Sequence, residues 1–298
     1  MLIYHRIDLL ESNAQTLVNP VNCVGVAGKG IAAQFKRRYP EMFKSYQQAC
    51  VTGKLAPGKP WLWQSPSRWI LNFPTKTHWR NPSKLEWIEA GLENFVAKFN
   101  NMGISGIAFP RLGCGNGGLS WDDVRPLMER HLMNLPINVY IHDYEVNLGL
   151  PEHFEELLRQ LATTLPATTT FETFARNLRK VVEFADGRLV TLASRQKFEA
   201  EFTDGDSLVI TIDGQRHPIA VDDLHGLWLA LTNGLVTRER AERSAGAGAD
   251  QVLSMISLLP GIRPVEIQKP RSSTPEIAVE LKASPGPMSD VAPEAKSS

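Results

Sequence analysis

The sequence lacks the features that mark membrane and secreted proteins. Its 298 residues include three cysteines, which match no metal-binding spacing and cannot build a disulfide framework. No apolar run approaches the roughly 18 residues that a membrane-spanning helix needs. The first residues, Met1 to Arg6, have neither the basic start nor the apolar core of a signal peptide. We therefore expect a cytoplasmic globular protein with no membrane partner.

Metal-ligand patterns are also missing. The seven histidines form no paired spacing with cysteines or acidic residues. We therefore predict neither a metal nor a cofactor. Cys23 and Cys114 flank two glycine-rich segments, and each is interpreted as a small packing residue rather than a nucleophile.

Net charge is zero, but the charges are unevenly distributed. Residues 1–150 contain 16 Lys and Arg against 11 Asp and Glu. No acidic residue occurs between Glu41 and Glu86, and this window contains seven basic residues and four tryptophans. Basic and aromatic residues interleaved in this way suit a surface that follows phosphates and stacks on bases. The alternative is a solvated basic face over a tryptophan-rich core.

Strand-like and helix-like segments alternate through the first half. Predicted strands are Met1 to Tyr4, Thr16 to Val18, Trp69 to Phe73, Gly106 to Pro110 and Asn138 to Ile141. Predicted helices are Gly30 to Arg38, Glu41 to Gly53, one capped by Asn81 that continues to Phe99, and one capped by Ser120. This alternation predicts an α/β layer fold with ligands bound at the strand ends.

Two glycine-rich loops each lie between a predicted strand and a predicted helix. They are Val24 to Gly30 and Gly113 to Leu119. Backbone N–H groups in such a loop, together with the following helix N-terminus, can hold a phosphate. The first loop has neither the Walker A nor the G-x-G-x-x-G spelling. Two such loops can line one crevice and hold a diphosphate that is flanked by two sugars.

Three segments of the first half resemble a known protein family. Three long segments, NPVNCVGVAGKGIAAQFKRRYPEMF, NFPTKTHWRNPSKL and LGCGNGGLSWDDV, occur in the order that macrodomains show. The first 145 residues resemble most the DarG-type antitoxins, which remove ADP-ribose from DNA. The resemblance implies a three-layer α/β/α macrodomain with a central mixed sheet. It also implies ADP-ribose and ADP-ribosylated DNA as partners.

The same resemblance assigns the binding residues. Asp8 would accept a hydrogen bond from the adenine amino group, and Asn22 would orient the distal ribose. Without the family, Asp8 is interpreted as a turn residue and Asn22 as a turn former or helix cap. The implied ligand-binding set is Asp8, Val24, Gly25, Gly28, Gly30, Ile31, Pro110, Gly113, Cys114, Gly115, Asn116, Gly117, Gly118 and Leu119.

Lys76 is the predicted catalytic residue, with Asn22 beside it. Lysines in loops are usually solvated, but Phe73 and Trp79 could desolvate this amine and make it a nucleophile or base. The resemblance implies that Lys76 attacks or polarises the anomeric centre while the bond from base to ribose breaks. His78 could shuttle a proton, or it could be structural.

One departure limits this inference. A related group of lysine-using macrodomain hydrolases has an acid in the second loop, where this chain has Asn116-Gly117-Gly118. Asp122 and Asp123 suit the N-terminus of the next helix instead. We therefore expect no Lys/Asp pair and keep Lys76 as the catalytic candidate.

The second half has a different pattern. We predict a macrodomain at 1–150, a helix from Pro151 to Leu161 within a linker region at 151–170, a small α+β domain at 171–268 and a disordered tail at 269–298. The α+β domain shows no nucleophile and base pair. By its position alone, it is a candidate for binding a cognate toxin.

Two functions remain in view. One is an ADP-ribosyl glycohydrolase that acts on DNA bases as an antitoxin; the other is a non-catalytic ADP-ribose reader, or a hydrolase of ADP-ribosylated protein. The acid-free basic window favours DNA. Its candidate contacts are Lys36, Arg37, His78, Trp79 and Arg80.

Overall fold

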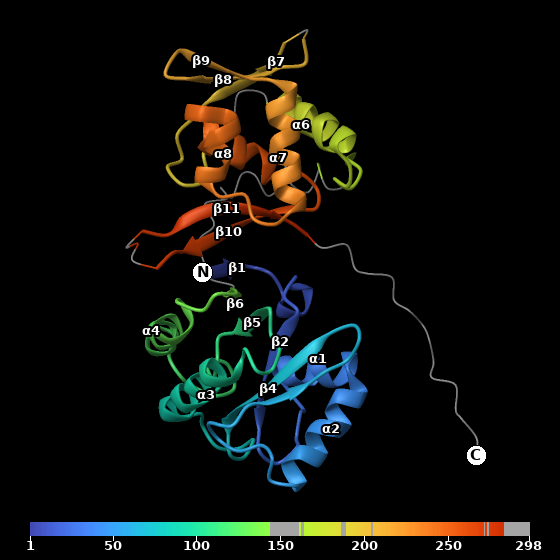
Figure 1. Ribbon diagram of the computed structural model, residues 1–298, viewed down its shortest axis with the longest axis vertical. Helices are drawn as coiled ribbons and strands as arrows, with labels where there is room; N and C mark the ends of the chain where they lie inside the picture. Colours follow the sequence, from blue (N-terminus) through green and yellow to red (C-terminus); the bar gives the residue numbers. More distant parts are fainter. Residues whose placement is uncertain are drawn as a thin grey trace, which may run out of the picture.

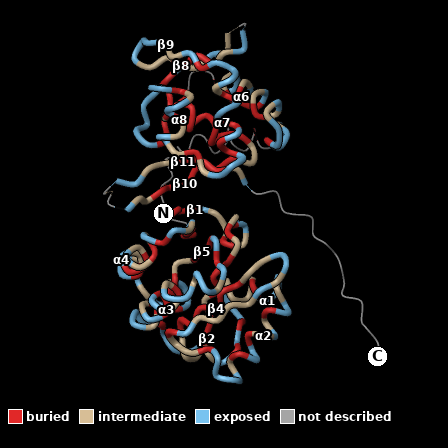
Figure 2. Tube along the Cα trace, in the orientation of Figure 1, coloured by how far each residue is buried: buried red, intermediate tan, exposed pale blue. Residues whose placement is uncertain are grey.

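The computed structural model describes residues 1–143, 161, 164–185, 189–203, 205–270, 272 and 274–282. They form two halves with a β-hairpin between them (Figure 1). Buried residues gather inside each half, and exposed residues cover the surface (Figure 2). Within the described residues, no helix has both the length and the apolar character needed to cross a bilayer.

A mixed eight-stranded sheet runs through the first half. Its strand order is β11-β10-β1-β6-β5-β2-β4-β3. Strands β1, β6, β5, β2 and β4 run parallel, whereas β3, β10 and β11 pair antiparallel with their neighbours. The strands are Leu2–His5 (β1), Thr16–Asn22 (β2), Trp61–Trp63 (β3), Trp69–Lys76 (β4), Gly106–Pro110 (β5), Asn138–His142 (β6), Ile262–Gln268 (β10) and Glu276–Leu281 (β11).

Helices cover both faces of this sheet, because its strands bury side chains on both. Leu17 belongs to the core that contains helices α1 and α2, whereas the next residue, Val18, belongs to the core beneath α3 and α4. The helices are Gly30–Arg38 (α1), Pro40–Val51 (α2), Leu85–Lys98 (α3) and Trp121–Leu132 (α4). The predicted three-layer α/β/α arrangement is confirmed.

Two local predictions in this half need correction. Strand β2 does not stop at Val18 but continues to Asn22. Its residues beyond Leu17 pair with β4 and not with β5, so no hydrogen bond to β5 requires the backbone N–H that Pro20 lacks. Asn81 does not cap α3, which begins at Leu85. The backbone N–H of Asn81 instead donates to the His78 carbonyl at 3.0 Å and closes a turn. The predicted Ser120 cap of α4 is confirmed.

The second half is a small α+β unit, as predicted. Its three-stranded sheet, in the order β7-β8-β9, packs with four helices around one apolar core. The elements are Phe171–Ala185 (α6), Glu199–Phe202 (β7), Leu208–Ile212 (β8), Gln215–Ile219 (β9), Val221–Thr232 (α7), Arg238–Ala245 (α8) and Ala249–Ile256 (α9). The helix predicted for Pro151 to Leu161 lies, apart from residue 161, outside the described residues.

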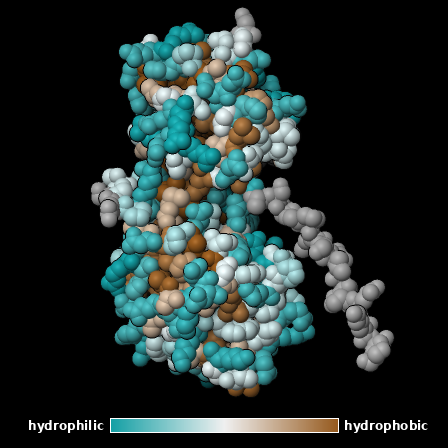
Figure 3. Space-filling model, in the orientation of Figure 1, coloured by the Kyte–Doolittle hydropathy of each residue, from teal (hydrophilic) through white to brown (hydrophobic). Residues whose placement is uncertain are grey.

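The hairpin of β10 and β11 joins the two halves. Strand β10 pairs antiparallel with β1, so the central sheet continues into this hairpin. Val265 and Ala278 belong to the core of the first half, whereas Ile262 and Val279 belong to that of the second. Apolar side chains are visible on the molecular surface where the halves meet (Figure 3). The predicted tail at 269–298 is therefore wrong for residues 276–281, which alternate as a strand within a Pro-, Ser- and Glu-rich context.

Charged side chains are buried at this junction. Arg263 donates from Nε to Glu280 Oε1 at 2.6 Å, and both side chains are almost fully buried. His5 Nε2 lies 3.4 Å from the same oxygen. Burial raises the pKa of Glu280, although Arg263 opposes this shift. The buried His5 ring lies 5.2 Å from that of His142, and burial lowers the pKa of His142 from 6.5 to about 4.

We expect Glu280→Ala to destabilise the protein strongly. Removing one partner leaves the Arg263 charge buried without compensation, which costs about 3 kcal/mol or more of unfolding free energy. Urea unfolding followed by circular dichroism measures this loss. The exposed pair of Arg243 and Glu239, 3.8 Å apart, offers the control, since Glu239→Ala should cost less than about 1 kcal/mol. Equal effects of the two substitutions would contradict a structural role for the buried pair.

We also expect stability to fall as the pH is lowered from 6.5 toward 4. Within this window His142 takes up a proton in the unfolded chain but not in the folded one, so acid favours unfolding. His142→Asn keeps a donor for the Ile7 carbonyl, which lies 3.0 Å from Nδ1, but cannot titrate. The variant should lose less stability than the wild type between pH 6.5 and 4.5, as measured by thermal unfolding. An unchanged pH dependence would show that His142 contributes nothing to it.

Candidate functional site

A cavity of about 980 Å³ opens at the carboxyl ends of the parallel strands. The last residues of β2, β4, β5 and β6 all line it: Asn22, Lys76, Pro110 and His142. In parallel sheets ligands bind at this edge, outside the strand ends and between the loops that leave them. The two glycine loops follow β2 and β5, so the topology brings both of them to this cavity.

The first loop is braced by Asn22. Its Oδ1 accepts hydrogen bonds from the backbone N–H groups of Val24 at 3.0 Å and Val26 at 3.3 Å, and its Nδ2 donates to the Val26 carbonyl at 2.6 Å. The Tyr46 hydroxyl donates to the Asn22 carbonyl at 2.8 Å. Gly25 has a φ of +75°, which allows the chain to turn here. Asn22 therefore acts as the turn former that its residue type allows, while also lining the cavity.

The second loop is closed by its own backbone and by the segment before α3. The N–H of Leu119 donates to the Gly113 carbonyl at 3.1 Å, and the N–H of Ser83 donates to the Gly117 carbonyl at 2.9 Å. A Cβ on Gly117 would lie 2.1 Å from the Gly113 oxygen, so only glycine fits. This loop thus presents backbone, not side chains, to most of its side of the cavity.

Lys76 connects the two loops. It is the Cα partner of Asn22 in the β2–β4 pairing, and its Nζ donates to the Asn116 carbonyl in the second loop. Its amine is therefore directed across the strand ends, between the loop that Asn22 braces and the loop that contains Asn116. Both predicted catalytic residues meet at the same edge of the cavity.

Asp8 and His142 lie together on the cavity wall. Asp8 caps a short 3-10 helix, Leu9–Glu11, and its Oδ1 accepts from the Leu10 N–H at 2.9 Å. The carboxylate interacts electrostatically with the buried ring of His142, but burial dominates and lowers the pKa of that ring. His142 is therefore neutral near pH 7, and it places no positive charge beside Asp8.

Sequence reasoning missed Arg111 and its partner. Arg111 follows β5, lines the cavity, and donates from Nη2 and Nε to Asp143 Oδ1 at 2.6 and 2.8 Å. The other oxygen of Asp143 accepts from Trp121 Nε1 at 2.9 Å. The signal was available, because Arg111, His142 and Asp143 stand at the ends of predicted strands on the ligand-binding edge.

Other predicted residues are distributed as follows. Val24, Gly25, Gly118 and Leu119 belong to the glycine loops but do not line the cavity, whereas the other predicted ligand-binding residues do. Trp79 and Arg80 line it too, and Lys36, Arg37 and His78 do not. Lys36 instead lies over the Phe43 ring, with its Nζ 4.6 Å from the ring centre.

The two cysteines near the loops are not activated. Burial raises the pKa of both the Cys23 and the Cys114 thiol to about 11, so each is protonated near pH 7. A thiol in this state is a poor nucleophile. This agrees with their interpretation as packing residues.

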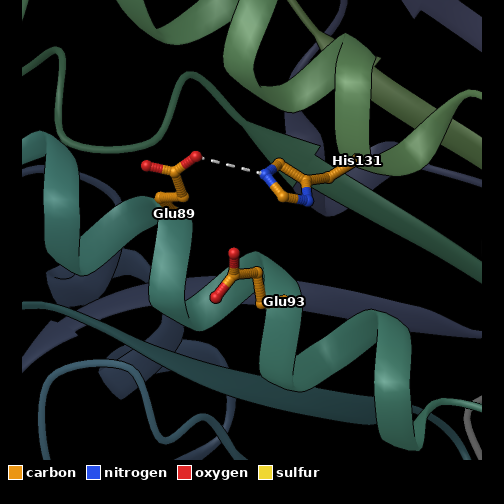
Figure 4. A group of neighbouring side chains, drawn as sticks. All are labelled: Glu89, Glu93 and His131. Atoms are coloured by element: carbon orange, nitrogen blue, oxygen red, sulfur yellow. Dashed lines mark ion pairs between the residues drawn. The ribbon is translucent and has the colours of Figure 1, made fainter.

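One group of potential metal ligands occurs among the described residues, away from the cavity. Glu89 and Glu93 on α3 face His131 on α4 (Figure 4). The His131 Nε2 lies 3.6 Å from Glu89 Oε1, and Arg130 Nη2 lies 2.6 Å from the same oxygen. Arg130 and His131 thus both contact Glu89. The absence of a metal stays a prediction from sequence.

The first half is similar in sequence to known proteins. Residues 18–128 match the Macro domain family profile. A DNA ADP-ribosyl glycohydrolase of Mycobacterium tuberculosis is 48% identical over 140 residues, which are 46% of this chain and 40% of that protein. A DNA ADP-ribosyl transferase-DNA ADP-ribosyl glycohydrolase fusion protein of Thermosipho africanus is 40% identical over 154 residues, which are 45% of this chain and 40% of the fusion.

The first half is also similar in sequence to a protein of known structure. The macrodomain of M. tuberculosis DarG is 46% identical, with 48% of this chain and 97% of that chain covered and a TM-score of 0.47. The chain spans about two fifths of the length of the curated relatives it matches. The matched segment contains most of β2, all of β4 and β5, both glycine loops and Lys76, and so most of the cavity wall. This chain therefore contains a Macro domain at residues 18–128.

Proposed function

We propose that this chain is an ADP-ribosyl glycohydrolase that removes ADP-ribose from modified DNA bases. The observation that carries the proposal is the position of Lys76, at a strand end between Asn22 and the second glycine loop of a macrodomain cavity. Relatives that share 40–48% of residues in this part are named as DNA ADP-ribosyl glycohydrolases or as a fusion that includes one.

The cavity suits ADP-ribose in size and chemistry. A volume of about 980 Å³ is enough for a nucleoside diphosphate sugar. The glycine loops offer backbone N–H groups at close approach, and α1 begins at Gly30 with its positive dipole end toward the cavity. In this arrangement the diphosphate lies along the loops, and the Asp8 carboxylate accepts a hydrogen bond from the adenine amino group.

The reaction centre then lies near Lys76. The bond between the anomeric carbon and the base breaks, the base leaves with a proton, and water supplies the hydroxyl that replaces it. Lys76 either forms a transient bond to the anomeric carbon or stabilises the charges that develop there. The Lys76 amine donates a hydrogen bond to the Asn116 carbonyl, so the second loop fixes the position of the amine.

We further propose an antitoxin role. The Thermosipho africanus relative joins a DNA ADP-ribosyl transferase and a glycohydrolase in one protein, which pairs addition with removal of the same modification. A glycohydrolase of this kind would act against the transferase that adds the modification. Binding of such a toxin by the α+β unit, residues 171–268, is part of this proposal and rests on its position in the chain.

Lys76→Ala should abolish cleavage while retaining ADP-ribose binding. Loss of the reacting amine is expected to slow release of ADP-ribose from a modified single-stranded oligonucleotide by about 100-fold or more. Affinity for free ADP-ribose, measured by calorimetry, should stay within about threefold. Lys54→Ala removes an exposed lysine outside the cavity and is the matched control.

Asn22→Ala should behave differently. It removes the three hydrogen bonds that brace the first loop, so ADP-ribose affinity should fall about tenfold or more. Full activity of Lys76→Ala, together with lost binding in Asn22→Ala, would rule out catalysis by Lys76, whereas absence of cleavage by the wild type with ADP-ribose binding retained would support a binding module.

Co-expression tests the antitoxin proposal. The full chain should restore growth of cells that express a DNA ADP-ribosyltransferase, because it removes the modification. Lys76→Ala should fail to do so if removal alone protects the cells, and it should still protect them if the chain also binds the toxin. No protection by the wild type, at confirmed expression, would contradict the antitoxin role.

A further inference from the structure

A turn after β4 places an exposed tryptophan at the mouth of the cavity. Trp79 is 46% exposed and lines the cavity together with Lys76, which ends β4 three residues earlier. An indole usually buries most of its area in a core or an interface. The position of this ring at a cavity mouth, on the side where Lys76 lies, indicates that a ligand covers it.

The turn is held in one conformation by hydrogen bonds. The backbone N–H of Asn81 donates to the His78 carbonyl at 3.0 Å, and that of Arg80 donates to His78 Nδ1 at 3.2 Å. The Asn81 amide also donates to Thr77 Oγ1 at 3.3 Å. The Thr77 carbonyl accepts from the Cys23 N–H at 3.2 Å, which ties the turn to the end of β2. Trp79 is therefore presented by a preformed scaffold.

A positively charged side chain and a second aromatic ring pack against the Trp79 ring. The Arg80 guanidinium carbon lies 4.5 Å from the centre of the indole ring, and the His78 ring is stacked with it at 5.4 Å between centroids. Arg80 also lines the cavity. A cation together with a partly exposed aromatic ring is the combination that binds a base and its neighbouring phosphate.

We propose that Trp79 stacks on the nucleobase that carries the ADP-ribose, with Arg80 near the adjoining phosphate. This inference rests on the proposed function, because it takes Lys76 as the place where the base leaves the anomeric carbon. The base then projects out of the cavity, toward the mouth that Trp79 borders. A carboxylate or hydroxyl of a protein acceptor has no aromatic face for the indole to cover. The substrate is thus a base outside a duplex, in single-stranded or locally opened DNA.

The chain provides a matched control in Trp87. It is a half-buried tryptophan on α3, and Lys84 Nζ lies 5.1 Å from its ring centre. Trp87 therefore shares the residue type and the neighbouring cation with Trp79, but it does not line the cavity. A general effect of removing a surface tryptophan should appear in both variants, and a base contact should appear at Trp79 alone.

The experiment measures binding without turnover. The full chain with Lys76→Ala serves as the parent, to which Trp79→Ala, Trp79→Phe or Trp87→Ala is added. Three probes are compared: free ADP-ribose, a single-stranded oligonucleotide with one ADP-ribosylated base, and an ADP-ribosylated peptide. Trp79→Ala should weaken oligonucleotide binding about 10- to 100-fold, the range for losing one base stack. It should change the other two affinities less than about threefold, with Trp79→Phe restoring most of the loss and Trp87→Ala changing nothing.

Other outcomes overturn the proposal. An equal loss for free ADP-ribose would make Trp79 a wall of the ADP-ribose site, and an equal loss for the peptide would make it a general acceptor contact. An unchanged oligonucleotide affinity would remove it from recognition altogether. Retained binding of free ADP-ribose shows that each variant is folded. Cleavage by the Lys76-intact chain is assayed separately, so a failure of the proposed hydrolase function is distinguished from a failure of base stacking.

Discussion

The parallel pairing of β2 with β4 and β5 is the constraint on which the site depends. Because the three strands run in the same direction, the segments that leave them all emerge at one edge of the sheet. The register then sets Asn22 opposite Lys76, so the residue that braces one loop adjoins the residue that contacts the other. A shift of β4 by one residue would turn Lys76 to the other face of the sheet. The packing of Leu71 and Phe73 against α3 opposes such a shift.

Both glycine loops lie at this edge of the sheet, but different interactions hold their conformations. A side chain, Asn22, holds the first loop, and backbone contacts with steric exclusion at Gly117 hold the second. Both solutions leave backbone N–H groups and little side-chain bulk beside the cavity. Fixed backbone donors need no rearrangement when a diphosphate binds, which favours affinity through preorganisation.

Most helices and strands of the first half follow from the sequence, because local pattern and tertiary structure agree there. Gly30 to Arg38 is helical as predicted, and Ser120 caps α4. The residues that were missed, Arg111 and Asp143, stand at the ends of predicted strands, but their pairing across 32 positions is not visible in either local segment. The β10–β11 hairpin was missed for a similar reason. Its strands are stabilised by pairing with β1 and by two separate cores, which no local window contains.

The residues of the acid-free window between Glu41 and Glu86 have different roles, which composition alone does not show. Arg68 donates to the backbone carbonyls of Ser12 and Ala14, so it stabilises the fold. Trp61 and Trp63 form the edge strand β3, which is also structural. The window therefore agrees partly with the interpretation of a tryptophan-rich core.

What remains for ligand contact is the end of β4 and the turn that follows it. This segment contains Lys76, Trp79 and Arg80, all of which line the cavity. In the proposed function, the glycine loops would hold any ADP-ribose, because they would contact the part that all such substrates share. Selectivity for the acceptor must come from groups beyond the anomeric carbon. Lys76 ends β4 and Trp79 follows it by three residues in the next turn. In the proposed function, this one segment would therefore set both the position of bond cleavage and the surface that the leaving group meets.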